Sequence, residues 1–202
     1  NELLRKQGMP VDEMIGWLDN LLFTKYRSRF SRQYTLAITG ALEHLTALGA
    51  HAMFDERDIL GDAHPNVRAL YAWHAIEEME HKAVVFNVMT TVAKVGYFKR
   101  SAAMIYATLE MTFETYRSTD VLLKADGFSW LERKRMFFAH LPWMYGRNGV
   151  FSSFSGMILA YLKPGFHPDD IPVVHNYPDW IQAYERTGDP GQACDALIAA
   201  AY

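Results

Sequence analysis

Hydrophobic residues recur every three or four positions along nearly the whole chain, which is the spacing of amphipathic helices. No segment alternates apolar and polar residues over the length of a strand, and no β-α-β pattern is present. The pattern therefore predicts an all-α fold, divided by proline, glycine and helix-capping residues. Helices are expected at residues 11–29, 31–54, 65–95, 98–125, from 129 with a break near Pro142, 149–162, 178–186 and 190–201.

Turn-forming residues separate these helices most clearly at two places. Residues 61–65 form an expected turn, and Pro65 suits the first position of the helix that follows. Residues 163–168 hold two prolines and a glycine and are expected to form a loop. No repeat or low-complexity linker interrupts the sequence, so residues 1–202 are expected to form a single all-α domain with a short C-terminal extension.

The composition narrows the class of protein. Of the 202 residues, 50% are hydrophobic and 14% are aromatic, which is typical of a folded chain and not of a disordered one. The formal net charge is −3 and no basic block is present, so nucleic acid is not an expected partner. The single cysteine, Cys194, excludes an internal disulfide and a thiolate zinc site, and it fits a cytoplasmic protein.

No signal peptide is recognisable, and no run of residues is suited to crossing a membrane. The longest uncharged run, residues 148–162, is shorter than the roughly 20 residues that a bilayer requires. We expect it to be a buried core helix, and we expect no membrane partner. Long apolar helices leave a homodimer open as an alternative to a monomer.

The strongest chemical signal lies in the run from Trp73 to Lys82. His74, Glu78 and His81 occur at i, i+4 and i+7 and therefore share one face of a helix. The same face continues through apolar positions, which are Val67, Leu70, Tyr71, Val85 and Val88. A buried charge is costly unless it is paired or binds a metal. A Glu-x-x-His pair that projects inward is the half-site of dinuclear iron or manganese centres in helix bundles, so this face predicts metal binding.

Glu43, on the preceding helix, is the expected fourth ligand. Its neighbours along the same face are small, so another helix can approach closely around this one carboxylate. The alternative is a partly exposed carboxylate at a seam between helices. For Glu78, the alternative is a surface pair with Lys82, and for His81 it is an ordinary core histidine. His74 could instead donate a hydrogen bond to a ligand carboxylate without touching the metal.

Other polar residues are weaker candidates. His44 and His51 lie about 100° around the helix from Glu43, and structural roles are expected for both. Glu110, Glu114 and Arg117 share a face of the helix at 98–125. They predict either a solvated row of ion pairs or the polar wall of a pocket above the metals.

Three segments give the chain a resemblance to a known family. Residues 41–47 read Ala-Leu-Glu-His-Leu-Thr-Ala, residues 73–82 contain the His-Glu-His pattern, and residues 164–168 read Pro-Gly-Phe-His-Pro. Together they resemble the bacterial predicted metal-dependent hydrolases, over nearly the whole chain. The resemblance implies a ferritin-like bundle with two metal ions, and it implies that Glu43, His74, Glu78 and His81 are metal ligands.

The resemblance also raises an expectation about the start of the chain. Proteins of that family carry an N-terminal segment expected to supply a Glu on one helix and a Glu-x-x-His on the next. Residues 1–8 resemble what directly follows that second motif. We therefore expect the ligand set to be completed by residues that this sequence does not include.

A second, local similarity concerns the metal geometry. The His-x-x-x-Glu-x-x-His spacing of His74, Glu78 and His81 is similar to that of di-iron arylamine N-oxygenases, where the additional histidine binds one iron. Imidazole and carboxylate ligands suit iron, with manganese as the alternative. The resemblance thus implies a dinuclear-metal hydrolase, whereas the ligand set favours O₂ chemistry. The aromatic and methionine-rich interior indicates a small, largely apolar substrate. The alternatives are an O₂-activating di-iron oxygenase or oxidase, and a non-enzymatic metal-binding or helical interaction protein.

Overall fold

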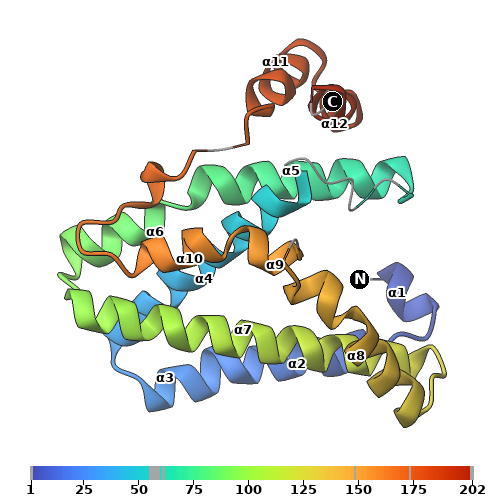
Figure 1. Ribbon diagram of the computed structural model, residues 1–202, viewed down its shortest axis with the longest axis horizontal. Helices are drawn as coiled ribbons and strands as arrows, with labels where there is room; N and C mark the ends of the chain where they lie inside the picture. Colours follow the sequence, from blue (N-terminus) through green and yellow to red (C-terminus); the bar gives the residue numbers. More distant parts are fainter. Residues whose placement is uncertain (1, 55–59, 61, 148, 173, 201–202) are drawn as a thin grey trace.

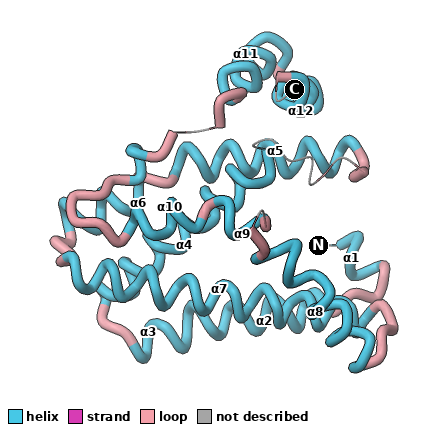
Figure 2. Tube along the Cα trace, viewed as in Figure 1, coloured by secondary structure: helices cyan, strands magenta, loops and turns pink. Residues whose placement is uncertain are grey.

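The computed structural model describes residues 2–54, 60, 62–147, 149–172 and 174–200 (Figure 1). Within these ranges the chain forms helices joined by loops and turns, without strands (Figure 2). The elements are α1 (Glu2–Lys6), α2 (Val11–Asp19), η1 (Asn20–Lys25), α3 (Tyr26–Arg29), α4 (Arg32–Phe54), α5 (Pro65–His81), α6 (Val84–Asn87), η2 (Val88–Val92), α7 (Tyr97–Ala125), α8 (Trp130–Tyr145), α9 (Val150–Ser153), α10 (Ser155–Tyr161), η3 (Pro168–Asp170), α11 (Tyr177–Thr187) and α12 (Pro190–Ala199). The all-α prediction is confirmed.

Most predicted helices are present with ends shifted by one or two residues. The helix expected at 11–29 is the continuous succession of α2, η1 and α3, in which η1 is wound as a π-helix. The helix expected at 65–95 bends between α5 and α6, although no proline or glycine marks the bend in the sequence. Residues 61, 148 and 201, which belong to a predicted turn, to the uncharged run and to a predicted helix, lie outside the described residues.

The predicted break near Pro142 is wrong, because α8 continues through this residue to Tyr145. Proline removes its own N–H from the helical ladder and crowds the carbonyl four residues earlier, but Pro142 lies within the last turn before the helix ends at Tyr145. The amide of Gly146 donates to the carbonyl of Pro142 at 2.8 Å and closes the last turn. The cost of the missing bond is therefore small enough for the helix to persist.

The helix expected at 149–162 is divided into α9 and α10 around Phe154. The hydroxyls of Ser153 and Ser155 donate to the carbonyls of Val150 and Ser152 at 2.6 and 2.8 Å. Such local bonds compete with the helical ladder, which explains an interruption that apolar periodicity does not reveal. Phe154 is 6% exposed and Tyr161 is fully buried, so the run does contribute to the core.

Helix α4 lies at the centre of the molecule, with α7 on one side and α5 on the other (Figure 1). The face toward α7 is built from residues such as Ala37, Ile38 and Ala41, which pack with Ala103 and Met104 of α7. All five are at most 1% exposed. Small side chains at this contact allow the two helices to approach closely. One side of α4 therefore contacts α7, and the other side contacts α5.

The C-terminal helices α11 and α12 pack together and cover one face of α5. Ala72, Ile76 and Met79 are buried there against residues that include Trp180 and Leu197. This contact buries one face of α5 and leaves much of the opposite face exposed. It therefore determines how the helix is rotated about its own axis. None of the helices in the described ranges combines the length and apolar character needed to cross a membrane.

A buried arginine holds the loop at 163–168 against the core. Arg100 of α7 is 5% exposed, and it donates to the carbonyls of Lys163 at 2.7 Å and Phe166 at 3.3 Å. Its guanidinium also lies over the ring of Tyr161 at 5.3 Å. These contacts explain why a loop rich in proline and glycine is ordered: a buried cation satisfies its carbonyl groups.

Candidate metal centre

Glu43 lies on the face of α4 that is directed toward α5. Its side chain is half-buried, whereas Ala47 and Ala50 on the same face are buried. Burial raises the pKa of the Glu43 carboxyl, the nearby charge of Glu78 raises it further, and His81 acts in the opposite direction. Glu43 is therefore close enough to both Glu78 and His81 to feel their charges across the interhelix contact.

Glu78 is held by a threonine and approached by a histidine. The hydroxyl of Thr46 donates to Oε2 of Glu78 at 2.6 Å, and Nε2 of His74 lies 3.5 Å from the other carboxylate oxygen. The Glu78 side chain is 22% exposed. The threonine was not predicted from the sequence as a site residue, although it lies one turn after Glu43 on the neighbouring part of the same face.

The alternative of a surface pair between Glu78 and Lys82 is wrong. Lys82 is 8% exposed, and its ammonium group donates to the carbonyl of Ile171 in the loop that crosses the helix. Glu80 instead lies on the outer side of α5, where its carboxylate accepts a hydrogen bond from Tyr177 at 2.6 Å. Glu78 thus faces α4, as the metal prediction requires.

The two histidines are more exposed than the sequence pattern suggests. The His74 side chain is 58% exposed and lies near Glu77 as well as Glu78, and His81 is also exposed. The apolar positions of the same face are exposed too: Val67 by 41%, Leu70 by 63% and Val88 by 43%. The expectation that this face is buried holds around Glu78 and Val85, which lie against α4, whereas α11 and α12 cover another face.

The carboxylates of Glu43 and Glu78 are not neutralised by a lysine or arginine in the part of the chain that the structure describes. Two carboxylates that face each other without a cation repel, and this repulsion favours the protonated form of one of them. A divalent cation would favour the ionised form of both, and the adjacent imidazole side chains are further ligands of the kind that transition metals bind.

The comparisons with known proteins identify the family. A family model described as predicted metal-dependent hydrolase matches residues 1–171. The chain belongs to this family. The metal-dependent hydrolase match includes α4 and α5, which carry the candidate ligands, and it ends just before the C-terminal helices. The comparison with curated proteins and the comparison with solved structures each found no match.

The metal-dependent hydrolase family implies a metal ion, and the structure allows a test of how well this chain fits one. The donor types fit, since carboxylates of α4 and α5 face each other beside two imidazoles. The geometry is incomplete: in the described ranges, no three His, Cys, Asp or Glu side chains converge into a group that could hold an ion. The contacts that do exist join Glu78 to His74 and bring Glu78 near Glu43. The described residues therefore provide part of a site, held in place by Thr46.

Three of the weaker candidates have structural roles. His44 is 1% exposed and packs against the rings of Tyr161 and Phe166, with centroids 5.0 and 5.4 Å away. Burial lowers its pKa to about 4, so the ring is neutral at pH 7. Glu114 accepts a hydrogen bond from Trp17 of α2 at 2.9 Å, and Arg117 stacks over the same indole at 3.9 Å. These residues fasten α2 to α7.

Proposed function

We propose that this protein is a dinuclear-metal hydrolase, with iron as the expected metal and manganese as the alternative, and with Glu43, His74, Glu78 and His81 as ligands. One observation carries the proposal: the carboxylates of Glu43 and Glu78 face each other beside two histidines and without a lysine or arginine partner in the described ranges. Membership of the metal-dependent hydrolase family supports it independently. We expect the substrate to be small and largely apolar.

Each residue has a separate task in this proposal. Glu78 lies between Glu43 and His74, so it is the residue best placed to be shared between two ions. Thr46 fixes the orientation of the Glu78 carboxylate through a bond of 2.6 Å and limits its rotation. His74 reaches Glu78 from the preceding turn of α5 and adds a nitrogen donor. The fixed donors lower the cost of assembling the site.

The chemistry expected of bound metal ions is to lower the pKa of a water molecule and to polarise the bond that is cleaved. The chain's own contribution is electrostatic and steric. Glu43 and Glu78 concentrate negative charge on the seam between α4 and α5, which favours cations over anions there. Met79 and Ile76, buried on the adjoining face of α5, leave this helix little freedom to rotate.

The direct test is hydrolysis by protein loaded with one metal at a time. We expect Mn- or Fe-loaded protein to cleave short-chain ester or amide substrates, and we expect Glu78→Ala to abolish cleavage. Glu80→Ala is the matched control, since Glu80 lies on the same helix but bonds Tyr177 on the outer side. Equal activity in the Glu78→Ala and wild-type proteins would remove the proposed site from the reaction.

The position of His74 favours one alternative, an O₂-activating di-iron oxygenase. His74 lies 3.5 Å from Glu78, so the His-x-x-x-Glu-x-x-His spacing does bring the additional imidazole to the shared carboxylate. The two functions differ in a measurable way. If the ferrous protein consumes O₂ far faster than ferrous iron in buffer, and Glu43→Ala loses that advantage, oxidation replaces hydrolysis. If it is inert to O₂ while the loaded protein cleaves esters, the hydrolase proposal stands.

A further inference from the structure

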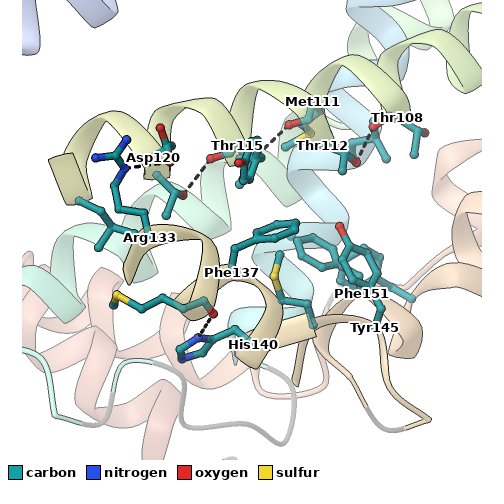
Figure 3. Close-up of a pocket in the computed structure, with 18 of the residues that line it drawn as sticks. Thr108, Met111, Thr112, Thr115, Asp120, Arg133, Phe137, His140, Tyr145 and Phe151 are labelled. Atoms are coloured by element: carbon teal, nitrogen blue, oxygen red, sulfur yellow. Dashed lines mark hydrogen bonds and ion pairs between the residues drawn. The ribbon is translucent and has the colours of Figure 1, made fainter. Parts of the chain in front are cut away.

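A cavity of about 400 Å³ lies between α7, α8 and the α9–α10 segment, away from the candidate metal centre (Figure 3). It extends along α7 from Thr108 to Leu123, with Asp120 one turn before Leu123, and this corresponds to about 22 Å of helix. A volume of this size is within the range of small-molecule sites. Its length along a single helix suits an extended ligand better than a compact one.

The walls of the cavity are apolar even where the residues are polar. Thr108, Thr112, Thr115 and Thr119 follow one another along α7, and each hydroxyl donates to the carbonyl four residues earlier at 2.7–2.8 Å. The hydroxyls are therefore satisfied within the helix and require no partner from a ligand. Aromatic and methionine side chains complete the wall, including Met136, Phe137, Tyr145 and Phe151.

One end of the cavity is charged. Arg133 donates through Nε to Asp120 at 3.1 Å and through Nη1 to the carbonyl of Phe128 at 3.0 Å. Its side chain is only 11% exposed, and among the described residues its Nη2 group has no hydrogen-bond partner. Lys134 does not itself line the cavity, but its ammonium group contacts the lining residue Tyr116 and lies 3.4 Å from Asp120.

The charges at this end do not balance. Two cations, Arg133 and Lys134, are set against one carboxylate, Asp120. The nearby Glu132 does not compensate, because its carboxylate is bonded to the backbone amide and hydroxyl of Ser129 at the start of α8. An apolar cavity that ends at a net positive charge complements an amphiphile with one apolar chain and one anionic head.

We propose that this cavity binds a medium-chain fatty acid, with the alkyl chain along the threonine face of α7 and the carboxylate at Arg133. The site lies apart from the metal centre. Leu45 and Gly49 of α4 line the cavity, and Leu45 is about 200° around the helix from Glu43. Fatty acid binding therefore does not require metal, and the two proposals stand or fall separately.

The test is calorimetric titration of the metal-free protein with laurate, a twelve-carbon carboxylate, and with dodecylammonium, which has the same chain and the opposite charge. We expect laurate to bind with one site per chain. We expect dodecylammonium to bind at least about tenfold more weakly, since it places a cation beside Arg133 and Lys134. Absence of laurate binding, or equal binding of both amphiphiles, would overturn the proposal.

Gly49→Phe locates the binding. Gly49 lines the cavity, and a Cβ added there meets nothing within 4 Å, so a phenyl ring can enter the space without a backbone clash. We expect laurate affinity to fall at least about tenfold. Gly16→Phe is the matched control, because Gly16 also has open space around it but lies on α2, outside the cavity wall. It should bind laurate as the wild type does.

A second filling variant, Thr115→Phe, guards against a folding defect in the first, and circular dichroism establishes that each variant is folded. Retained laurate binding in either folded variant overturns the location. Lys134→Met should lower the affinity for laurate several-fold and so reduce the ratio of laurate affinity to dodecylammonium affinity. An unchanged ratio would refute the role of the charged end. Glu78→Ala should leave laurate binding unchanged, and loss of binding there would contradict the independence of the two sites.

Discussion

Glu43 of α4 and Glu78 of α5 lie near each other across the interhelix contact, where burial and then the charge of Glu78 raise the pKa of Glu43. The chain does not balance this pair with a lysine or an arginine in the described ranges; Thr46 binds Glu78, and His74 lies beside it. Paired carboxylates of this kind destabilise a metal-free protein and become favourable once a cation binds. The relationship therefore predicts opposite effects of one substitution in the two states.

Glu43→Gln should stabilise the metal-free protein and eliminate stabilisation by metal. Removing the charge relieves the repulsion from Glu78, and the gain should be less than about 1 kcal/mol because the carboxyl is partly solvated. The measurement is thermal unfolding with chelator and with added Mn²⁺, and Glu80→Gln serves as control. The interpretation would be contradicted if Glu43→Gln had a lower melting temperature than the wild type in chelator. It would also be contradicted if Mn²⁺ raised the melting temperature of both proteins equally.

Thr46→Val should weaken metal binding without removing it. The substitution keeps the shape of the side chain but deletes the donor that orients Glu78. Loss of an orienting partner typically costs about 10–100-fold in metal affinity, and the hydrogen bond itself is worth about 1 kcal/mol of stability. Thr46→Ser retains the hydroxyl and should restore most of the affinity. Competition against a metal-binding dye measures the metal affinity of each variant. Identical affinities of Thr46→Val and Thr46→Ser would exclude a role for Thr46 in orienting Glu78.

Arg100→Met should destabilise the protein by about 2–4 kcal/mol, because it leaves the carbonyls of Lys163 and Phe166 without their buried donor. Methionine fills similar space, so the effect reports the lost hydrogen bonds more than a cavity. Urea unfolding gives the difference. Lys99→Met is the control: Lys99 is partly exposed on the same helix and donates to the side chain of Gln33, so its loss should change stability by less than about 0.5 kcal/mol.

Asp120→Asn should lower stability at neutral pH but not in acid. Burial acts to raise the pKa of Asp120, but bonds from Arg133 and Lys134 outweigh it and hold the pKa below its ordinary value of 3.8. A carboxyl with a lowered pKa stabilises the fold above that value, and its contribution is lost as the pH falls through the pKa of the folded state. We expect a deficit of at most about 1 kcal/mol at pH 7 that shrinks below about pH 4. A deficit independent of pH would show that the pairing contributes little.

The helices were predictable because their apolar spacing and their terminal signals agree. Gly96 and Asp126 border α7 as expected, and Ser129 caps α8 through a bond to the amide of Glu132. The errors arose where a local contact decided the outcome. The hydroxyls of the serines around Phe154 donate to nearby carbonyls and interrupt the helix. The amide of Gly146 donates to the carbonyl of Pro142 and completes the last turn of α8.

The candidate site was predictable in part. Periodicity brought His74, Glu78 and His81 to one face of α5, but it could not show that α11 and α12 cover a different face and leave His74 exposed. The cavity on α7 was missed, although threonines at 108, 112, 115 and 119 share a helix face in the sequence. Threonines on a helix normally indicate a solvated surface, and only the packing of α8 turns them into a wall.

The central claim is that the contact between α4 and α5 binds metal through Glu43, His74, Glu78 and His81. The most direct test is to measure the metal content of single-residue variants and to titrate each of them with metal by calorimetry. We predict that wild-type protein and Glu80→Ala bind Mn²⁺ or Fe²⁺, that Glu78→Ala loses binding, and that His74→Ala is weakened to a smaller degree. Glu78→Ala with the affinity and stoichiometry of the wild type would contradict the account, because Glu78 is the carboxylate that lies near both Glu43 and His74.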